Sequence, residues 1–342
     1  MRTMIKYLYS VLIILFISSC QTNTPQKSFD QLLNEFFQKD SVRIVVTDSG
    51  LGGVSIAADV VKRMKNSGVF KNVDVIFFNA QPHKRSGYNS MKTTEQKVEV
   101  FNNALKAMEE HFHPDLLLIG CNTLSVLYDY TEFSKTAKFP VVGIVGTGVD
   151  LIKQKLDQDK NSDVIIFATK TTVKQGQHKK GLIKLGIKES NIYTQACPKL
   201  AGRIERGPDS DTTKSLVNIY VKEALQKYKN NGNPLYVSYN CTHYGYVDTL
   251  FKEAFKRNGV KVKEFLDPNP LMADFIFTPD HLNRFKDTKV SVRIVSQPEL
   301  SPGKIGAIYS LIEPISPETA EALMEYEYTP DYFEWESIAN KK

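Results

Sequence analysis

The chain has 342 residues, of which 42% are hydrophobic and 24% charged, and this mixture excludes a disordered or collagen-like polypeptide. Its net charge of +6 comes from 44 Lys and Arg against 38 Asp and Glu, and no basic run is long enough to indicate nucleic-acid binding. Four cysteines are too few for a disulfide scaffold of this size, and the length predicts about two domains.

The beginning of the chain has the pattern of a secretory signal. A short basic region precedes an apolar stretch, residues 7–17, that is shorter than the roughly 20 residues of a membrane-spanning helix. The stretch runs into the sequence ISSC, and small residues before a cysteine resemble the lipobox of bacterial lipoproteins. We therefore expect removal of residues 1–19, lipidation of Cys20, a tether and lead-in over 20–40, and an exported protein anchored to a membrane and facing the periplasm or cell exterior. A plain signal peptide or an N-terminal membrane anchor are the alternatives.

After the tether, short apolar runs alternate with longer amphipathic stretches, which predicts an α/β protein with parallel strands. Residues 53–66 and 93–112 have helical spacing of their apolar side chains. The expected strands are residues 43–47, 73–78, 116–119 and 141–144 in the first half, and 163–167 and 235–239 in the second half.

A strand followed by a polar turn occurs in both halves, which predicts two similar Rossmann-like lobes with mainly parallel sheets. Ligands of open α/β sheets bind beyond the carboxyl ends of the strands, so we expect the active site between the lobes. We place the first lobe at 41–150, with a C-terminal return near 260–285, and the second lobe at 151–260. Residues 285–342 contain a strand-like run and form a C-terminal extension of unknown role.

Two cysteines lie in similar polar settings. Cys121 and Cys241 each follow an apolar strand and precede small hydrogen-bonding residues, whereas a structural cysteine usually lies within an apolar run. His243, two residues after Cys241, is placed to exchange a proton nearby. A single cysteine of this kind favours a structural role, but one in each half favours a catalytic pair. Cys197 precedes a proline without that context, so we interpret it as structural.

An aspartate also ends the first expected strand. Asp48 precedes the glycine-rich residues 49–53, where backbone N–H groups are open to a ligand, although Asp48 is equally suited to capping the next helix. The loop lacks the spacing of a dinucleotide fingerprint or a phosphate-binding loop. The cysteines and His243 lack the short gaps of zinc knuckles, so we expect no metal.

Five segments follow one another along the chain: 48–53 (DSGLGG), 121–123 (CNT), 168–173 (ATKTTV), 196–198 (ACP) with Glu205, and 241–244 (CTHY). Together they resemble the glutamate racemase group of the cofactor-independent Asp/Glu racemase superfamily. The resemblance covers roughly residues 41–275, and Asp267 stands near the place of the family's Asp-Ser-Gly turn. One such segment alone would be a weak indication, but all five in family order are specific.

The resemblance implies two lobes with the substrate between them and assigns roles by position. Cys121 and Cys241 would be the two acid/base thiols, Asp48 would assist Cys121, and Glu205 and His243 would assist Cys241. The residues implied in substrate binding are Ser49, Ser86, Gly87, Asn122, Thr123, Thr172 and Thr242. The resemblance implies an amino acid as the ligand and no cofactor; it leaves a homodimer open.

The sequence departs from the family pattern near the expected site. Residues 85–88 (RSGY) replace the Pro-Tyr-Gly loop that cradles the substrate, which puts glutamate specificity in question, and His178 stands where a tyrosine is usual. The lipobox and the chain beyond about residue 285 also lie outside the pattern.

The function that we expect is cofactor-independent racemisation of an amino acid, glutamate or aspartate, by two thiols on opposite faces of the α-carbon. The alternatives are a racemase-like amino-acid-binding lipoprotein without turnover, and another cysteine-dependent enzyme such as a lyase or amide hydrolase. Because a binding protein needs no second thiol, the presence of both Cys121 and Cys241 favours racemisation. An exported enzyme would act on external amino acids, since peptidoglycan precursors are built in the cytoplasm.

Overall fold

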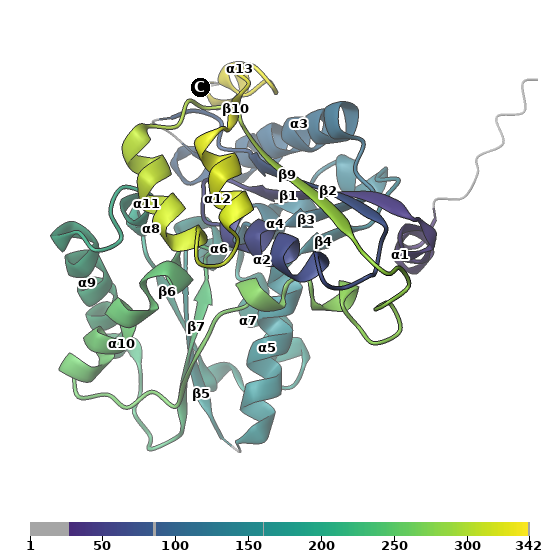
Figure 1. Cartoon of the computed structure of the whole chain (residues 1–342). Helices are drawn as coiled ribbons and strands as arrows, with labels where there is room; N and C mark the ends of the chain where they lie inside the picture. Colours follow the sequence, from purple (N-terminus) through teal and green to yellow (C-terminus); the bar gives the residue numbers. More distant parts are fainter. Residues whose placement is uncertain (1–26, 85–86, 160, 341–342) are drawn as a thin grey trace, which may run out of the picture.

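The computed structural model describes residues 27–84, 87–159 and 161–340, which fold into two α/β lobes (Figure 1). Each lobe is built around one sheet, and every strand pairing among these residues is parallel. The expected fold class is therefore confirmed. The expected signal sequence and Cys20 lie outside the described residues. None of the described helices is long and apolar enough to cross a membrane.

The first lobe has a six-stranded sheet whose central strands are buried on both faces. Residues 44–48 of β1 and 75–79 of β2 are all buried, as expected for parallel strands that have helices on either side. In sheet order the strands are β10 (Glu327–Tyr328), β9 (Lys289–Ser296), β2 (Asn72–Asn79), β1 (Ser41–Asp48), β3 (Leu116–Ile119) and β4 (Val141–Gly143).

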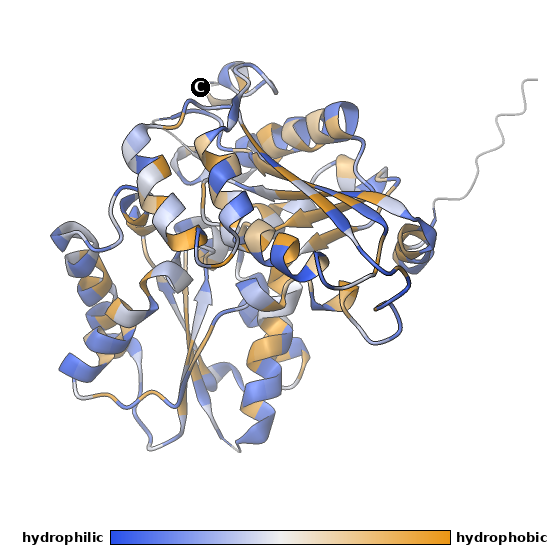
Figure 2. Ribbon diagram, viewed as in Figure 1, coloured by the Kyte–Doolittle hydropathy of each residue, from blue (hydrophilic) through white to orange (hydrophobic). Residues whose placement is uncertain are grey.

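Helices cover both faces of this sheet, and their apolar residues face it (Figure 2). One face is covered by α1 (Phe29–Gln38), α2 (Val54–Met64), α11 (Pro302–Ile312) and α12 (Pro317–Met324). The other face is covered by α3 (Thr94–Phe112), α4 (Asn122–Tyr128) and α13 (Glu336–Ala339).

The second lobe repeats this plan on a smaller scale. Its strands, in sheet order, are β6 (Ile192–Ala196), β5 (Asp163–Ala168), β7 (Leu235–Asn240) and β8 (Glu264–Leu266). The helices on its two faces are α5 (Ile144–Gln158) and α7 (Gln177–Lys184) on one, and α9 (Asp211–Lys227) and α10 (Asp248–Arg257) on the other. Two short helices, α6 (Lys170–Gln175) and α8 (Leu200–Ile204), follow the ends of β5 and β6. They begin at the edge of the sheet that faces the first lobe.

The strands and helices expected from the sequence are present with small differences at their ends. The expected helices 53–66 and 93–112 correspond to α2 and α3, and all six expected strands of the two halves are found. After β8 the chain comes back to the first lobe, where Met272 and Ile276 are buried in the core beside α2.

The second half of the segment expected as a tether and lead-in forms α1. Ser28 caps this helix by accepting a hydrogen bond from the N–H of Gln31, whose side chain bonds back to the N–H of Ser28. Leu32 and Phe36, spaced at four residues, are buried together with Phe37 against the sheet. The apolar face of α1 therefore belongs to the core of the first lobe.

The C-terminal segment, to which the sequence assigned no role, completes the first lobe. β9 pairs with β2 along its full length, and α11 and α12 pack against each other and against α2. Ile308, Ile312 and Leu323 are fully buried in this layer. Without this segment, β2 would become an edge strand and one face of the sheet would be partly exposed.

We expect Leu323→Ala to lower the free energy of unfolding by about 2–5 kcal/mol, because it removes a buried side chain from the core that α12 shares with α2. The matched control is Met324→Ala at the next position of α12, whose side chain is 58% exposed; its effect should stay within about 0.5 kcal/mol. Denaturant unfolding measures both. If both variants have the same free energy of unfolding, a structural role for the C-terminal segment would be contradicted.

Candidate functional site

The candidate site is a cavity of about 540 Å³ between the lobes, at the carboxyl ends of both sheets. Asp48 ends β1 and Cys121 follows β3 in the first lobe, while Thr169 follows β5 and Cys241 follows β7 in the second. All four line the cavity. Parallel strands thus bring together residues that lie far apart in the sequence.

The first-lobe thiol lies at the start of α4. Cys121 is 5% exposed, and its Sγ lies 3.1 Å from the Ser49 hydroxyl. Burial raises the pKa of Cys121 well above its usual value, and the nearby charge of Asp48 raises it further. Cys121 is therefore a protonated thiol at rest.

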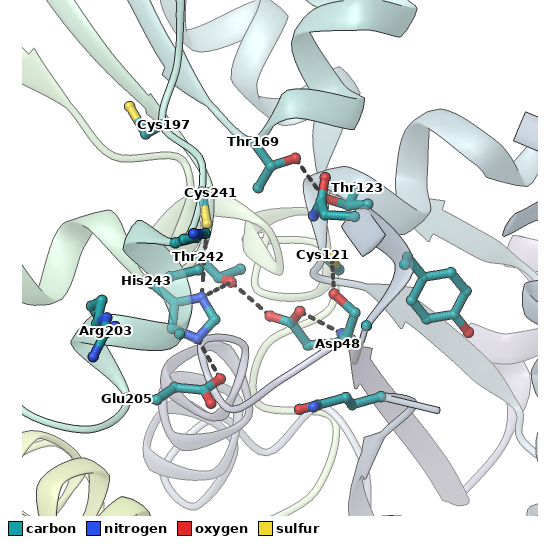
Figure 3. A pocket seen from close by; sticks show the side chains of 18 of the residues that line it. Asp48, Cys121, Thr123, Thr169, Cys197, Arg203, Glu205, Cys241, Thr242 and His243 are labelled. Carbon is teal, nitrogen blue, oxygen red and sulfur yellow. Dashed lines mark hydrogen bonds and ion pairs between the residues drawn. The ribbon is translucent and has the colours of Figure 1, made fainter. Parts of the chain in front are cut away.

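Asp48 links this thiol to the second lobe. Its Oδ2 accepts a hydrogen bond of 2.6 Å from the Thr242 hydroxyl, and its Oδ1 accepts one of 2.6 Å from the N–H of Ser49 (Figure 3). Burial raises the pKa of Asp48 above its usual value, and the charge of His243 and the bond from Thr242 oppose that shift. The carboxyl group is thus buried, partnered from both lobes and suited to exchange a proton with a neighbouring group.

The second-lobe thiol has a different set of partners. Cys241 Sγ lies 3.7 Å from His243 Nδ1, and His243 Nε2 lies 2.7 Å from Glu205 Oε1 (Figure 3). Burial alone would lower the pKa of His243, but its bonds to Cys241 and Glu205 and their charges raise it well above its usual value. A protonated His243 donates to both neighbours, so Cys241 has a cationic hydrogen-bond donor beside its sulfur.

The glycines of the loop after β1 allow this close approach of the lobes. A Cβ on Gly52 would lie 2.2 Å from Thr242 Oγ1 and 2.5 Å from His243 Nδ1, and a Cβ on Gly50 would lie 2.4 Å from Glu205 Oε1. No side chain fits at either place without displacing these groups. The backbone of this loop therefore packs directly against Thr242, His243 and Glu205 of the second lobe.

Hydroxyl and amide groups occupy the part of the cavity near α4 and α6. Thr123 and Thr169 join their hydroxyls at 2.7 Å across the two lobes, and Thr169 Oγ1 lies 3.0 Å from Thr172 Oγ1. Asn122 is 1% exposed and lines the cavity, yet neither its Nδ2 nor its Oδ1 has a hydrogen-bond partner among the described residues. A buried amide without partners is costly, so Asn122 is placed to bind a polar ligand.

Most residues singled out from the sequence line this one cavity. They are Asp48, Ser49, Gly87, Cys121, Asn122, Thr123, Glu205, Cys241, Thr242 and His243. Thr172 stands behind Thr169 and is not among the lining residues, because its hydroxyl points to Thr169. Ser86 lies outside the described residues. His178 is buried outside the lining, where burial lowers its pKa to about 4.

Sequence reasoning did not select several residues of the cavity wall. Thr169 directly follows β5, so the same strand-end argument that selected Cys121 could have found it. Lys304 lines the cavity from α11, and no local pattern in the sequence marks it. Cys197, interpreted as structural, is 2% exposed and belongs to the second-lobe core, although it also borders the cavity. Within the described ranges, no group of three or more His, Cys, Asp or Glu is arranged to hold a metal ion.

Comparison with known proteins relates this chain to racemases, although no family model matches it. The chain is 25% identical over 248 residues to a glutamate racemase of Lysinibacillus sphaericus, covering 70% of this chain and 86% of the relative. It is 29% identical over 206 residues to a glutamate racemase of Campylobacter jejuni, covering 59% of this chain and 73% of that one.

Solved structures show the same fold. The structure of a glutamate racemase isoform from Bacillus anthracis matches with a TM-score of 0.60 at 18% identity, covering 86% of this chain and 97% of the other. That of the Francisella tularensis glutamate racemase in complex with D-glutamate matches with a TM-score of 0.59 at 17% identity, covering 85% and 96%. The sequence relatives, together with the shared fold, support an amino-acid racemase, an isomerase.

We expect Gly52→Ala to lower kcat/KM for racemisation by about 100-fold while the protein stays folded, because the new Cβ displaces Thr242 and His243 by more than a small relaxation allows. Gly146→Ala on α5 is the matched control, since a Cβ there would meet no other element of the described residues within 4 Å. Circular dichroism of the amino acid measures the rate. Wild-type activity in Gly52→Ala would show that the fit between this loop and the second lobe is unimportant.

Proposed function

We propose that this chain interconverts the enantiomers of an acidic amino acid, glutamate or aspartate, by a two-thiol mechanism without a cofactor. The observation that carries the proposal is that each lobe supplies one buried cysteine with its own partners. Cys121 has Ser49 and Asp48, and Cys241 has His243 and Glu205. A site that only binds an amino acid would need neither pair.

The different settings of the two thiols suit a reaction that needs one base and one acid. The thiolate of Cys241 takes the α-proton, the electron pair of the broken C–H bond stays on the substrate, and the thiol of Cys121 donates its proton to the opposite face. The reverse direction exchanges these roles. One proton leaves the substrate and one enters it, so the step ends with a thiol at Cys241 and a thiolate at Cys121, which is the state that starts the reverse reaction. Loss of a proton from Cys241 to solvent and uptake of one by Cys121 restore the starting state.

The substrate carbanion requires stabilisation, since the α-proton of an amino acid is only weakly acidic. Negative charge that develops on the α-carboxylate is stabilised by hydrogen-bond donors that are already in place. Asn122, whose amide has no protein partner within the described residues, and the hydroxyls of Thr123 and Thr169 are such donors. We assign the α-carboxylate to this part of the cavity.

An acidic side chain suits the remaining wall. Four basic residues line the cavity and have no ion pair within the described part of the chain: Lys170, Lys199, Arg203 and Arg206. Their positive charge favours a substrate with a second carboxylate. The relatives named above are glutamate racemases, which supports the same substrate class.

Single replacement of the two thiols tests the mechanism. In Cys121→Ser and Cys241→Ser, we expect racemisation of glutamate and aspartate to fall by more than about 10,000-fold, because a serine hydroxyl replaces a thiol that must act in either direction. Elimination from a substrate with a good β-leaving group needs only one face. Each variant should therefore keep elimination for one enantiomer and lose it for the other, with opposite preferences in the two variants.

The two variants are matched controls for each other, and the amide glutamine is the matched control for the substrate. Equal rates on glutamate and glutamine would exclude selection of the side-chain carboxylate. If both variants prefer the same enantiomer, or if either racemises at the wild-type rate, the two-thiol mechanism is wrong.

We further propose that the protein is an exported lipoprotein, held at a membrane through lipidated Cys20. The support is the basic, apolar and lipobox order of the first twenty residues. The enzyme would then act on amino acids outside the cytoplasm.

The intact mass of protein extracted from membranes should correspond to a chain that begins at Cys20 and carries lipid. The reason is that a lipobox directs cleavage before its cysteine and modification of the thiol. Cys20→Ala is the control and should abolish both the lipid and membrane retention. A wild-type chain that still begins at Met1 would contradict the proposal.

A further inference from the structure

The C-terminal segment contributes one charged side chain to the cavity. Lys304 lies in the first turn of α11, and its Nζ is 2.6 Å from Glu205 Oε2. The Lys304 side chain is 14% exposed and that of Glu205 is 5% exposed. An ion pair with this degree of burial is screened little by solvent, in contrast to the surface pairs of the chain.

The position of Lys304 is held by the core of the first lobe. Ile308 and Ile312, one and two turns further along α11, are fully buried against the layer formed by α2 and α12. Lys65, the residue that follows α2, forms an exposed ion pair with Glu318 of α12 at the surface of the same layer. The ammonium group of Lys304 is therefore presented to the site by a packed helix.

Lys304 completes the set of bonds around Glu205. Oε1 of Glu205 accepts from His243 Nε2 at 2.7 Å and from the N–H of Leu51 at 2.8 Å, which leaves Oε2 for Lys304. Burial by itself would raise the pKa of Glu205, but His243 and Lys304 together hold it far below its usual range. The carboxylate stays charged and cannot take the proton of His243.

We propose that Lys304 is a positioning residue of the racemase, which keeps Glu205 ionised and oriented toward His243 and so maintains the thiolate of Cys241. This role rests on the proposed two-thiol function. Four groups then form a row of alternating charge: the thiolate of Cys241, the imidazolium of His243, the carboxylate of Glu205 and the ammonium of Lys304. Each group stabilises its neighbour. Without Lys304 the row carries a net negative charge, which disfavours the thiolate.

Other titratable groups face this row from neighbouring elements, and their charges enter the same balance. Asp48 acts on His243 from the end of β1, and Cys197 acts on Cys241 from the end of β6. Tyr244 and Tyr246 face the row from the turn after β7. Four basic residues line the same cavity: Lys170, Lys199, Arg203 and Arg206. All of these are unchanged when Lys304 is replaced, so a difference between variants reports on Lys304.

Alkylation of each cysteine by iodoacetamide as a function of pH, followed by peptide mass spectrometry, tests this role. In Lys304→Met we expect the midpoint of Cys241 alkylation to rise by about one pH unit, because a positive charge is lost from the row. The midpoint of Cys121 should move much less. Lys304→Arg should restore the wild-type midpoint, since it restores the charge. Racemisation by Lys304→Met should show the same shift in its pH profile.

Lys65→Met is the matched control, because it removes an ion pair of the same helical layer outside the cavity. It should leave both midpoints unchanged. An unchanged Cys241 midpoint in Lys304→Met, an equal shift at Cys121, or no rescue by arginine would overturn the proposal. Alkylation requires no turnover, so the two proposals can fail separately. A wild-type protein that does not racemise amino acids would refute the proposed function. The shift in the midpoint pH of Cys241 alkylation would still decide the role of Lys304.

Discussion

The hydrogen bond from the Thr242 hydroxyl to Asp48 is the contact on which the arrangement of the site depends. It joins the end of β1 in the first lobe to the turn after β7 in the second, at 2.6 Å and fully buried. Two parallel sheets that face each other with their carboxyl ends make this contact possible, since each strand delivers its following residue to the same gap. Gly50 and Gly52 leave the space in which the lobes meet.

The two catalytic cysteines are chemically identical, but they lie in different surroundings. Cys121 is buried near the charge of Asp48, and both effects favour the neutral thiol. Cys241 lies beside His243, whose protonated form is stabilised by Glu205, so a cationic donor faces its sulfur. Proton transfer through the substrate needs such a difference at rest, because two thiols or two thiolates could not carry out both halves of the reaction.

The C-terminal segment connects the stability of the first lobe to the chemistry of the second. β9 lies between β10 and β2, and α11 and α12 cover the sheet face that also holds α2. The same α11 carries Lys304 to Glu205. The segment beyond the racemase-like part of the sequence is thus continuous with the core, and packing that supports the fold also places a charge in the site.

Most strands and helices, and the polar residues at the strand ends, could be predicted from local patterns in the sequence. Alternation of apolar runs and helical spacing is local, so strands such as 43–47 and helices such as 93–112 could be predicted, and with them Asp48 and Cys121 at strand ends. Local patterns could not show which hydroxyl faces the cavity. Thr169 and Thr172 are three residues apart, and the hydroxyl of Thr172 bonds to that of Thr169, which lines the cavity. The ion pair between Lys304 and Glu205 could not be predicted either. It depends on how α11 packs on the sheet, and a contact between residues so far apart in the chain leaves no periodic pattern in the sequence.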